Sequence, residues 1–427
     1  LPKGSEWTTS SPEALAEFEL GMEAAKKLYH DDAMRHMQRA IELDPDFVSA
    51  KVILVEMAKM DKEMSEGLIE EIRQADLEGL KPRERFFVER DIAFWDKNTE
   101  EVARVIDEYL ERYPNDPYIV EAAAIRTFSR GDNETSERLN RRLLEISPNW
   151  VLAYNQLGYI TMLQGRFAEA EEYFTSYRFI APDQANPHDS LGELYIILGR
   201  YPEAAQSIET ALEIKPDFWL SYNHLVLARV LMGDFVGARR VVEEAKNAEN
   251  SPEWLTAGID CQVRYHELEH QNAWSDILAA QDSDCFDDEH PYDLPHRVTH
   301  RAACQLGEWE LATKIEETLS GFVEQARESG SSETFDAMTN LLYHLEGVRS
   351  ALSGDLEGAE KAFGNADAGL TYRDSGLGMY KVFNRLFLVE TLLARGKDAE
   401  AHKLLAKVRA VNPVSVAEFE EHGLKMM

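Results

Sequence analysis

Apolar residues recur along most of the chain at the three- and four-residue spacing that places them on one face of a helix. Residues 155–174, NQLGYITMLQGRFAEAEEYF, contain two such stretches separated by a short turn at Gly165 and Arg166. The same arrangement returns in residues 189–208, DSLGELYIILGRYPEAAQSI, and in residues 223–242, NHLVLARVLMGDFVGARRVV. The pattern predicts helices that follow one another in pairs, with no strand between them.

Small residues and prolines return at a period of 34 residues. A glycine is expected to end the first helix of each pair in a left-handed conformation, and an alanine lets the two helices approach closely. A proline prevents the second helix from continuing. The frame extends backwards to about residue 14, which gives seven units over residues 14–252. The recurring positions are Gly165, Gly199 and Gly233, then Ala170, Ala204 and Ala238, then Pro182 and Pro216.

Four dipeptides predict where helices begin, because each joins a capping side chain to a proline at the first helical position. They are Ser11-Pro12, Asp116-Pro117, Asn186-Pro187 and Ser251-Pro252. Beyond residue 252 the units diverge, but residues 303–315, 345–363 and 387–405 keep the paired pattern.

These residues and their period resemble the tetratricopeptide repeat, a helix–turn–helix unit of the same length. The resemblance implies an all-α fold, a right-handed α-solenoid of about eleven helix-turn-helix units. We predict an N-terminal segment or linker over 1–13 and seven units over 14–252. Diverged units with an acidic, histidine-containing loop (281–296) follow over 253–413, and a C-terminal capping helix over 414–427.

The same resemblance implies a protein or peptide partner, bound in a concave groove lined by the first helix of each unit. Asparagines there would bind a peptide backbone, aromatic rings would supply contact area, and carboxylates would favour Lys or Arg. The alternative is that some of these aromatics pack between neighbouring helices. The predicted groove residues are Phe87, Asp91, Trp95, Glu121, Phe128, Asn155, Tyr159, Asp189, Glu193 and Asn223.

Charge narrows the class of partner. The chain has 78 acidic and 45 basic residues, a formal net charge of −33. Nucleic acids and anionic membrane surfaces need basic patches, so the balance argues against both and favours basic partners. No stretch approaches the ~18 apolar residues that span a bilayer. The sequence begins at Leu1 without an initiator methionine, so either a cytoplasmic protein or one exported after removal of an N-terminal segment fits.

Cysteines and histidines supply little recognisable chemistry. Cys261, Cys285 and Cys304 are too few and too scattered to predict a disulfide framework or a thiolate metal site. Residues 266–270, HELEH, match the zinc-protease signature, in which His266 and His270 would bind the metal. The extended signature would continue with glycine and histidine at positions 273 and 276, where this chain has Ala and Asp. We therefore predict no metal site.

Helical spacing around this motif predicts a packing face on the side away from the two histidines. The predicted face consists of Trp254, Ala257, Cys261, Tyr265 and Leu268. From Tyr265 to His296 there is no Lys or Arg, but there are nine acidic residues and four histidines. This segment is either a solvated acidic loop or a region that responds to pH or to a divalent cation.

The sequence thus predicts a non-enzymatic interaction scaffold or sensor module without a cofactor, for which a homodimer is also compatible. Two alternatives stay open. The opening SPEALAEFELGMEAAKKLY followed by the array resembles tetratricopeptide arrays found C-terminal to bacterial signalling domains, so the chain would be a regulatory or oligomerising region of a longer protein. The other alternative is a zinc-dependent hydrolase built on HELEH.

Overall fold

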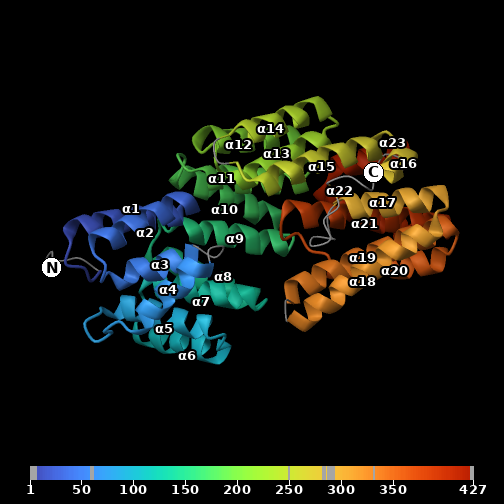
Figure 1. The fold of residues 1–427 in the computed structure, drawn as a ribbon. Coiled ribbons are helices and arrows are strands. Elements are labelled where there is room, and N and C mark those ends of the chain that lie inside the picture. The colour runs from blue at the N-terminus through green and yellow to red at the C-terminus, as the bar shows by residue number, and fades with distance from the viewer. Residues whose placement is uncertain are drawn as a thin grey trace. The chain divides into compact units, whose positions relative to one another are not determined.

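The computed structural model describes residues 7–57, 62–248, 251–280, 285, 294–329 and 332–423. Within these residues the backbone forms 23 α-helices and no strand (Figure 1). The first 22 helices are eleven consecutive pairs, and α23 follows them. The predicted all-α array of about eleven units is confirmed.

The chain divides into two compact units. Unit 1 consists of Leu1–Ile160 and Ser176–Pro182, and unit 2 of Thr161–Thr175 and Asp183–Met427, so α9 and α10 contribute to both. The helices up to α10 are α1 (Pro12–Lys26), α2 (His30–Leu43), α3 (Val48–Met57), α4 (Lys62–Arg73), α5 (Pro82–Trp95), α6 (Thr99–Arg112), α7 (Pro117–Ser129), α8 (Asn133–Ile146), α9 (Val151–Leu163) and α10 (Phe167–Ile180).

The remaining helices all belong to unit 2. None of the helices in the described part of the chain is both long and apolar enough to cross a bilayer. They are α11 (Ala185–Ile197), α12 (Tyr201–Ile214), α13 (Trp219–Leu231), α14 (Phe235–Asn247), α15 (Glu253–His270), α16 (Trp274–Ala279), α17 (Leu294–Leu306), α18 (Trp309–Ser329), α19 (Ser332–Ser353), α20 (Leu356–Gly369), α21 (Ser375–Ala394), α22 (Asp398–Val411) and α23 (Pro413–His422).

Two of the four predicted helix starts are confirmed and two are displaced. The Ser11 hydroxyl accepts a hydrogen bond from the Ala14 backbone N–H at 3.1 Å, and Asp116 caps α7 in front of Pro117. In contrast, α11 begins at Ala185, two residues before Pro187, and α15 begins one residue after Pro252. The first turn of a helix leaves backbone N–H groups unpaired, so a proline fits at several positions within it.

The recurring glycines end the first helices α9, α11 and α13 as predicted, whereas Leu28, Lys97 and Asn272 take the left-handed position after α1, α5 and α15. Their φ angles are 73° at Gly165, 72° at Gly199 and 70° at Gly233, in the left-handed region. After Gly199, the Arg200 N–H reaches back to the Tyr195 carbonyl at 2.8 Å and closes the helix end. The turn then directs the second helix back along the first.

Gly192 shows why the repeat also needs a glycine inside the first helix. A Cβ added there would lie 2.4 Å from Ile208 Cγ1 on α12. We expect Gly192→Ala to lower the free energy of unfolding by about 1–3 kcal/mol, because Ile208 must leave its packed position. Gly258→Ala on α15 is the control, since nothing lies within 4 Å of its added Cβ. Urea unfolding of the two variants checks this; equal stabilities would contradict it.

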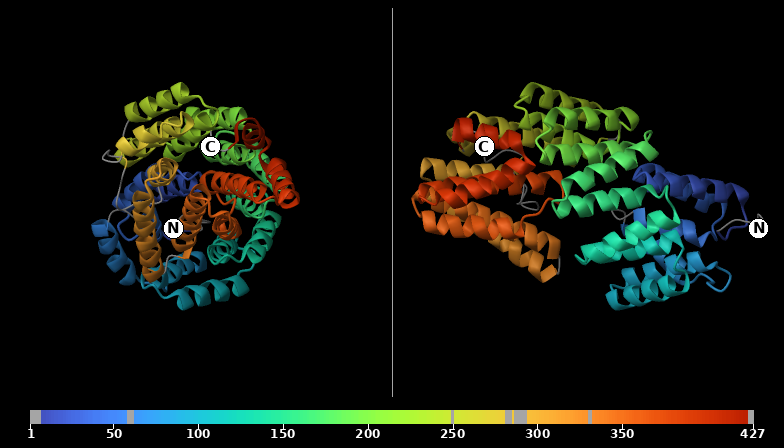
Figure 2. Two further views of the ribbon diagram at one scale, coloured as in Figure 1. Left: turned by 90° about the vertical axis from the view of Figure 1, so that its right-hand side faces the viewer. Right: turned by 180° about the vertical axis from the view of Figure 1, so that it is seen from behind.

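The two ends of unit 2 meet. The side-chain amide of Asn412, which caps α23, donates to the Ile197 carbonyl at 3.1 Å and to the Tyr201 hydroxyl at 3.2 Å. Gly378 on α21 faces Ile197 so closely that an added Cβ would lie 2.8 Å from it. α21 therefore lies beside α11, and α23 contacts α12 through the Tyr201 and Ser415 hydroxyls, 3.2 Å apart. Figure 2 shows the helices from two further directions.

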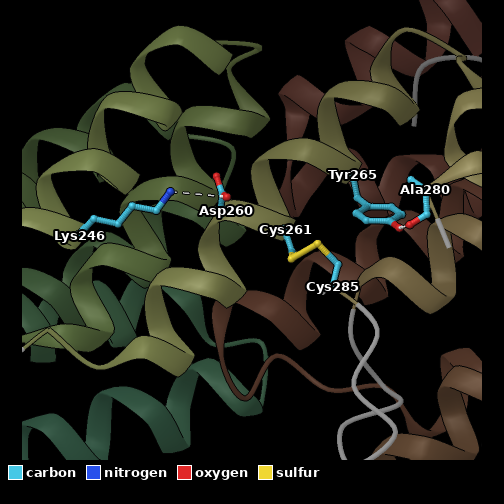
Figure 3. Close-up of a disulfide and its surroundings, with 6 residues drawn as sticks. All are labelled: Lys246, Asp260, Cys261, Tyr265, Ala280 and Cys285. Atoms are coloured by element: carbon cyan, nitrogen blue, oxygen red, sulfur yellow. Dashed lines mark hydrogen bonds and ion pairs between the residues drawn. A yellow bond between two sulfur atoms is a disulfide. The ribbon is translucent and has the colours of Figure 1, made fainter. Parts of the chain in front are cut away.

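One disulfide links Cys261 on α15 to Cys285, with a sulfur–sulfur distance of 2.02 Å (Figure 3). The spacing of the cysteines did not predict this bond. It forms because α16 turns back beside α15, where the Tyr265 hydroxyl donates to the Ala280 carbonyl at 3.2 Å. Cys304 is a buried free thiol, whose pKa burial raises to about 12. The rest of 282–290, DSDCFDDEH, lies outside the described residues, and α17 begins at Leu294, within the predicted loop.

Candidate functional site

Unit 2 encloses a cavity of about 460 Å³. Most of its wall comes from the first helix of each pair, namely α11, α13, α15, α17, α19 and α21, and α23 adds the last part. This is the inner face that the repeat pattern predicts for ligand contacts. The lining includes Glu193, Asn223, His224, Leu227, Val230, Phe235, Gln262, His266, Glu269, His270, Arg297, His344, Asp374, Ser375, Met379, Tyr380, Phe383, Phe387 and Glu418.

A histidine lies between two buried carboxylates at one side of this cavity. Asp189 and Glu193 are one helical turn apart on α11, and His224 reaches them from α13. The ring atom Nδ1 is 3.0 Å from Asp189 Oδ1, and Nε2 is 3.3 Å from Glu193 Oε1. Burial disfavours the charged ring, but the two carboxylates outweigh burial and raise the pKa of His224 to about 10. At neutral pH the three residues, here called the ionic clamp, carry one net negative charge.

The start of α21 joins the ionic clamp. Ser375 donates from its backbone N–H and from its hydroxyl to Glu193 Oε1, each at 3.1 Å. Asp374 caps α21 by accepting from the Leu377 N–H at 2.8 Å. Burial and the nearby charge of Glu193 raise the pKa of Asp374, and burial raises that of Glu418. This side of the cavity therefore has an excess of negative charge. Asp374 is half-buried there, whereas Glu418 is exposed.

On another part of the wall, two arginines surround Glu269. Its carboxylate accepts from Arg297 at 3.0 and 3.2 Å and from Arg301 at 3.0 Å, and all three side chains are buried. Burial opposes the charge on Glu269, but the arginines outweigh it and lower its pKa to about 2. Burial together with Arg297 lowers the pKa of His266 to about 4, so this imidazole is neutral at pH 7.

Comparison with known proteins identifies the repeat. A family model described as "Tetratricopeptide repeat" matches residues 187–218, which cover most of α11, its glycine turn and α12. This segment carries a tetratricopeptide repeat. No curated protein matches the sequence. The tetratricopeptide fold suggests an interaction scaffold with protein partners, and proteins of this repeat family are generally non-catalytic.

Several solved tetratricopeptide structures are similar to this chain at low identity. A tetratricopeptide repeat protein from Parabacteroides merdae is 15% identical, with 65% of this chain and 98% of that chain covered and a TM-score of 0.43. PilW, a type IV pilus biogenesis factor, is 14% identical, with 58% and 98% covered and a TM-score of 0.35. Part of a repeat protein from Cytophaga hutchinsonii is 14% identical, with 65% and 93% covered and a TM-score of 0.32.

The residues predicted to line the tetratricopeptide groove fall into two sets. In unit 2, Glu193 and Asn223 line the cavity, and Asp189 lies in the ionic clamp. In unit 1, internal partners occupy three others: Phe87 stacks on Trp7, Asp91 accepts from Arg90 at 2.7 Å, and Glu121 accepts from the Trp150 ring N–H at 2.6 Å. Their contact with a ligand stays a prediction. Half-buried in unit 1 are Trp95, Phe128, Asn155 and Tyr159.

The predicted packing face of α15 is wrong in its first half, although Tyr265 and Leu268 in its second half do pack in a hydrophobic cluster. Trp254 is 70% exposed, whereas Leu255, Ile259 and Val263 are buried. Successive residues point about 100° apart around a helix, and α15 packs against α13 and α14 on one side and α17 on the other. His266, which lies opposite the predicted packing face, lines the cavity.

The HELEH segment lacks the geometry of a zinc hydrolase. His266 and His270 both line the cavity, but Glu267 forms an ion pair with Arg239, with a nitrogen–oxygen distance of 3.0 Å. Glu267 would have to activate a metal-bound water in such an enzyme. Since its carboxylate is engaged elsewhere, the segment does not form the expected catalytic group.

The described residues contain one group of three potential metal ligands within 4.8 Å, the ionic clamp itself. Asp189 faces one ring nitrogen of His224 and Glu193 faces the other. A single ion would need both carboxylates on the same side of the ring, so this arrangement fits a protonated histidine better than a metal site. His224 follows Asn223, the residue that the repeat frame had selected. Asp374 and Glu418 lie outside that frame, and no repeat signal could have identified them.

Proposed function

We propose that this chain is a non-enzymatic scaffold that binds a segment of a basic partner protein in the cavity of unit 2. A lysine or arginine side chain of the partner would place its charged end near Asp374 and Glu418. The observation that supports this most directly is that both carboxylates line the cavity, where burial disfavours the charge of the half-buried Asp374. A cation bound beside them offsets that cost.

The rest of the wall suits the aliphatic part of such a side chain. Leu227, Met379 and Phe383 present apolar surface in the same cavity, along which the methylene groups of lysine or arginine can lie. Arg297 does not repel the ligand strongly, because Glu269 pairs with it. A volume of about 460 Å³ accommodates one or two side chains rather than a folded element, so the partner would enter with an extended segment.

Short peptides test this proposal. A panel of N-acetylated hexapeptides that differ only in one central residue (Lys, Arg, Gln or Glu) is titrated against the chain by fluorescence anisotropy. We expect the Lys and Arg peptides to bind about tenfold tighter than the Gln peptide, which corresponds to about 1.4 kcal/mol. Asp374→Asn, which retains a capping side chain, and Glu418→Gln should each remove that preference.

The matched control is Glu421→Gln, since this glutamate lies on the same helix, α23, but does not line the cavity, and its side chain is 75% exposed. Its peptide affinities should equal those of the unmodified chain. The proposal is contradicted when all four peptides bind equally, or when Glu421→Gln lowers the affinity for the Lys peptide as much as Glu418→Gln does.

A further inference from the structure

Residues 7–10 of the chain lie on the inner face of unit 1. They form no helix, and Trp7 is only 6% exposed. The centre of its ring is 4.7 Å from that of Phe18, 6.1 Å from Phe87 and 6.1 Å from Tyr118. These three residues belong to α1, α5 and α7, the first helices of three different pairs. One side chain reaches all three only on the side where the first helices converge, which is the side of the groove.

Buried carboxylates hold the backbone of this segment. The Thr8 N–H donates to Glu84 Oε1 at 2.8 Å, and the Ser10 N–H donates to Asp44 Oδ2 at 3.0 Å. The Thr9 hydroxyl also donates to Asp44, at 2.5 Å. The backbone N–H groups of two alternate residues, Thr8 and Ser10, thus donate to carboxylates from two different parts of the array. The Trp7 ring, which precedes them, packs among aromatic side chains. This is how a groove holds an extended peptide.

Hydrogen bonds from neighbouring residues fix the position of the Glu84 carboxylate. Ser49 donates to Glu84 Oε1 at 2.8 Å, and the Lys81 N–H donates to Glu84 Oε2 at 3.1 Å. Glu84 is fully buried and Asp44 is 8% exposed. Buried carboxylates with fixed positions bind backbone N–H groups strongly and independently of side-chain sequence. Trp7 then supplies a sequence preference, because its ring requires a pocket lined by aromatic residues. The Thr8 and Thr9 hydroxyls, which donate to Glu84 and Asp44, add a preference for hydroxyl residues.

We propose that the inner face of unit 1 is a second peptide-binding site, specific for an aromatic residue followed by two hydroxyl residues, and that residues 7–10 occupy it as an intramolecular ligand. A partner protein with a segment of this chemistry binds by displacing them. Phe87, one of the residues predicted to contact a ligand, stacks on Trp7 of this segment. The site differs from the cavity of unit 2 in residues and in ligand, so neither proposal depends on the other.

The probe is the acetylated tetrapeptide Trp-Thr-Thr-Ser, labelled at its C-terminal end and followed by fluorescence anisotropy. Trp7→Ala weakens the binding of residues 7–10 to the inner face of unit 1, and Trp7→Leu weakens it to a smaller extent. We expect the peptide to bind Trp7→Ala about tenfold tighter than the unmodified chain, with Trp7→Leu between them. Circular dichroism establishes that both variants are folded. Trp254→Ala, which changes an exposed tryptophan, should leave the affinity of the unmodified chain unaltered.

Two peptide variants show whether binding uses the contacts described. Alanine in place of the tryptophan should abolish binding. N-methylation of the first threonine, which removes the backbone N–H that donates to Glu84 and leaves the protein unchanged, should weaken binding about tenfold. The proposal is overturned if both Trp7 variants fold and bind the peptide no better than the unmodified chain. It is also overturned if neither variant folds, since residues 7–10 are then a fixed part of the fold. A concentration-dependent dimer that Trp7→Ala abolishes would assign the site to exchange between copies instead.

Discussion

Replacing Glu269 by glutamine is expected to lower the free energy of unfolding of unit 2 by about 3–5 kcal/mol. Glutamine keeps the volume and one hydrogen-bond acceptor, but it leaves Arg297 and Arg301 as buried cations without their counter-charge. Both arginines contact Glu269 within 3.2 Å, and Arg301 is 3% exposed. Arg301 does not line the cavity, so water has little access to replace its counter-charge. Urea unfolding monitored by circular dichroism measures the loss.

The stability that Glu269 contributes depends on pH, because its pairing with Arg297 and Arg301 requires the ionised carboxylate. The pKa of Glu269 is about 2 in the folded chain, below its ordinary value of 4.5. Its contribution is therefore fully present above pH 4.5 and is lost as the pH falls toward 2. The stability of Glu269→Gln should converge on that of the unmodified chain across this range.

Glu267→Gln is the matched control on the same helix. Glu267 also pairs with an arginine, Arg239, but half of the Arg239 side chain is exposed. An exposed pair of this kind contributes about 0–1 kcal/mol. If the two variants lose stability equally, burial of the pair is not the source of the effect.

The repeat architecture was predictable because it depends on local geometry that recurs. Gly165, Gly199 and Gly233 mark left-handed turns, and only glycine adopts that conformation without strain. The side of each pair that faces inward follows from the same frame, and Glu193 and Asn223, which the frame selects, line the cavity. Their contact with a ligand stays a prediction. These features require no knowledge of contacts between distant parts of the chain.

The closure of unit 2 was not predictable from the repeat. It depends on contacts such as those from Asn412 to Ile197 and from Ser375 to Glu193, which join residues about 180 to 215 positions apart. No local pattern encodes such pairs. The same limit applies to the ionic clamp: the frame marks Asp189 and Glu193 as inward-facing acids, but only the folded chain shows that His224 already holds them.

Raising the pH should remove the contribution of this clamp. The pKa of His224 is about 10 in the folded chain and ordinarily 6.5, because Asp189, Glu193 and the nearby Asp374 favour the protonated ring. A raised pKa contributes stability that is complete below pH 6.5 and declines as the pH rises toward 10. We expect the unmodified chain to lose about 3–5 kcal/mol over this range, the size typical of a broken buried ion pair.

His224→Gln distinguishes this loss from the titration of other groups in the same range. Glutamine does not carry the proton, so the variant should be less stable by about 3–5 kcal/mol at pH 6.5 and nearly equal to the unmodified chain at pH 10. His402→Gln, at an exposed position, should match the unmodified chain at every pH. Parallel stability curves for His224→Gln and the unmodified chain would contradict a charged histidine in the clamp. Converging curves would show that one proton between α11 and α13 stabilises the wall of the cavity, and that the cavity loses this support in alkaline solution.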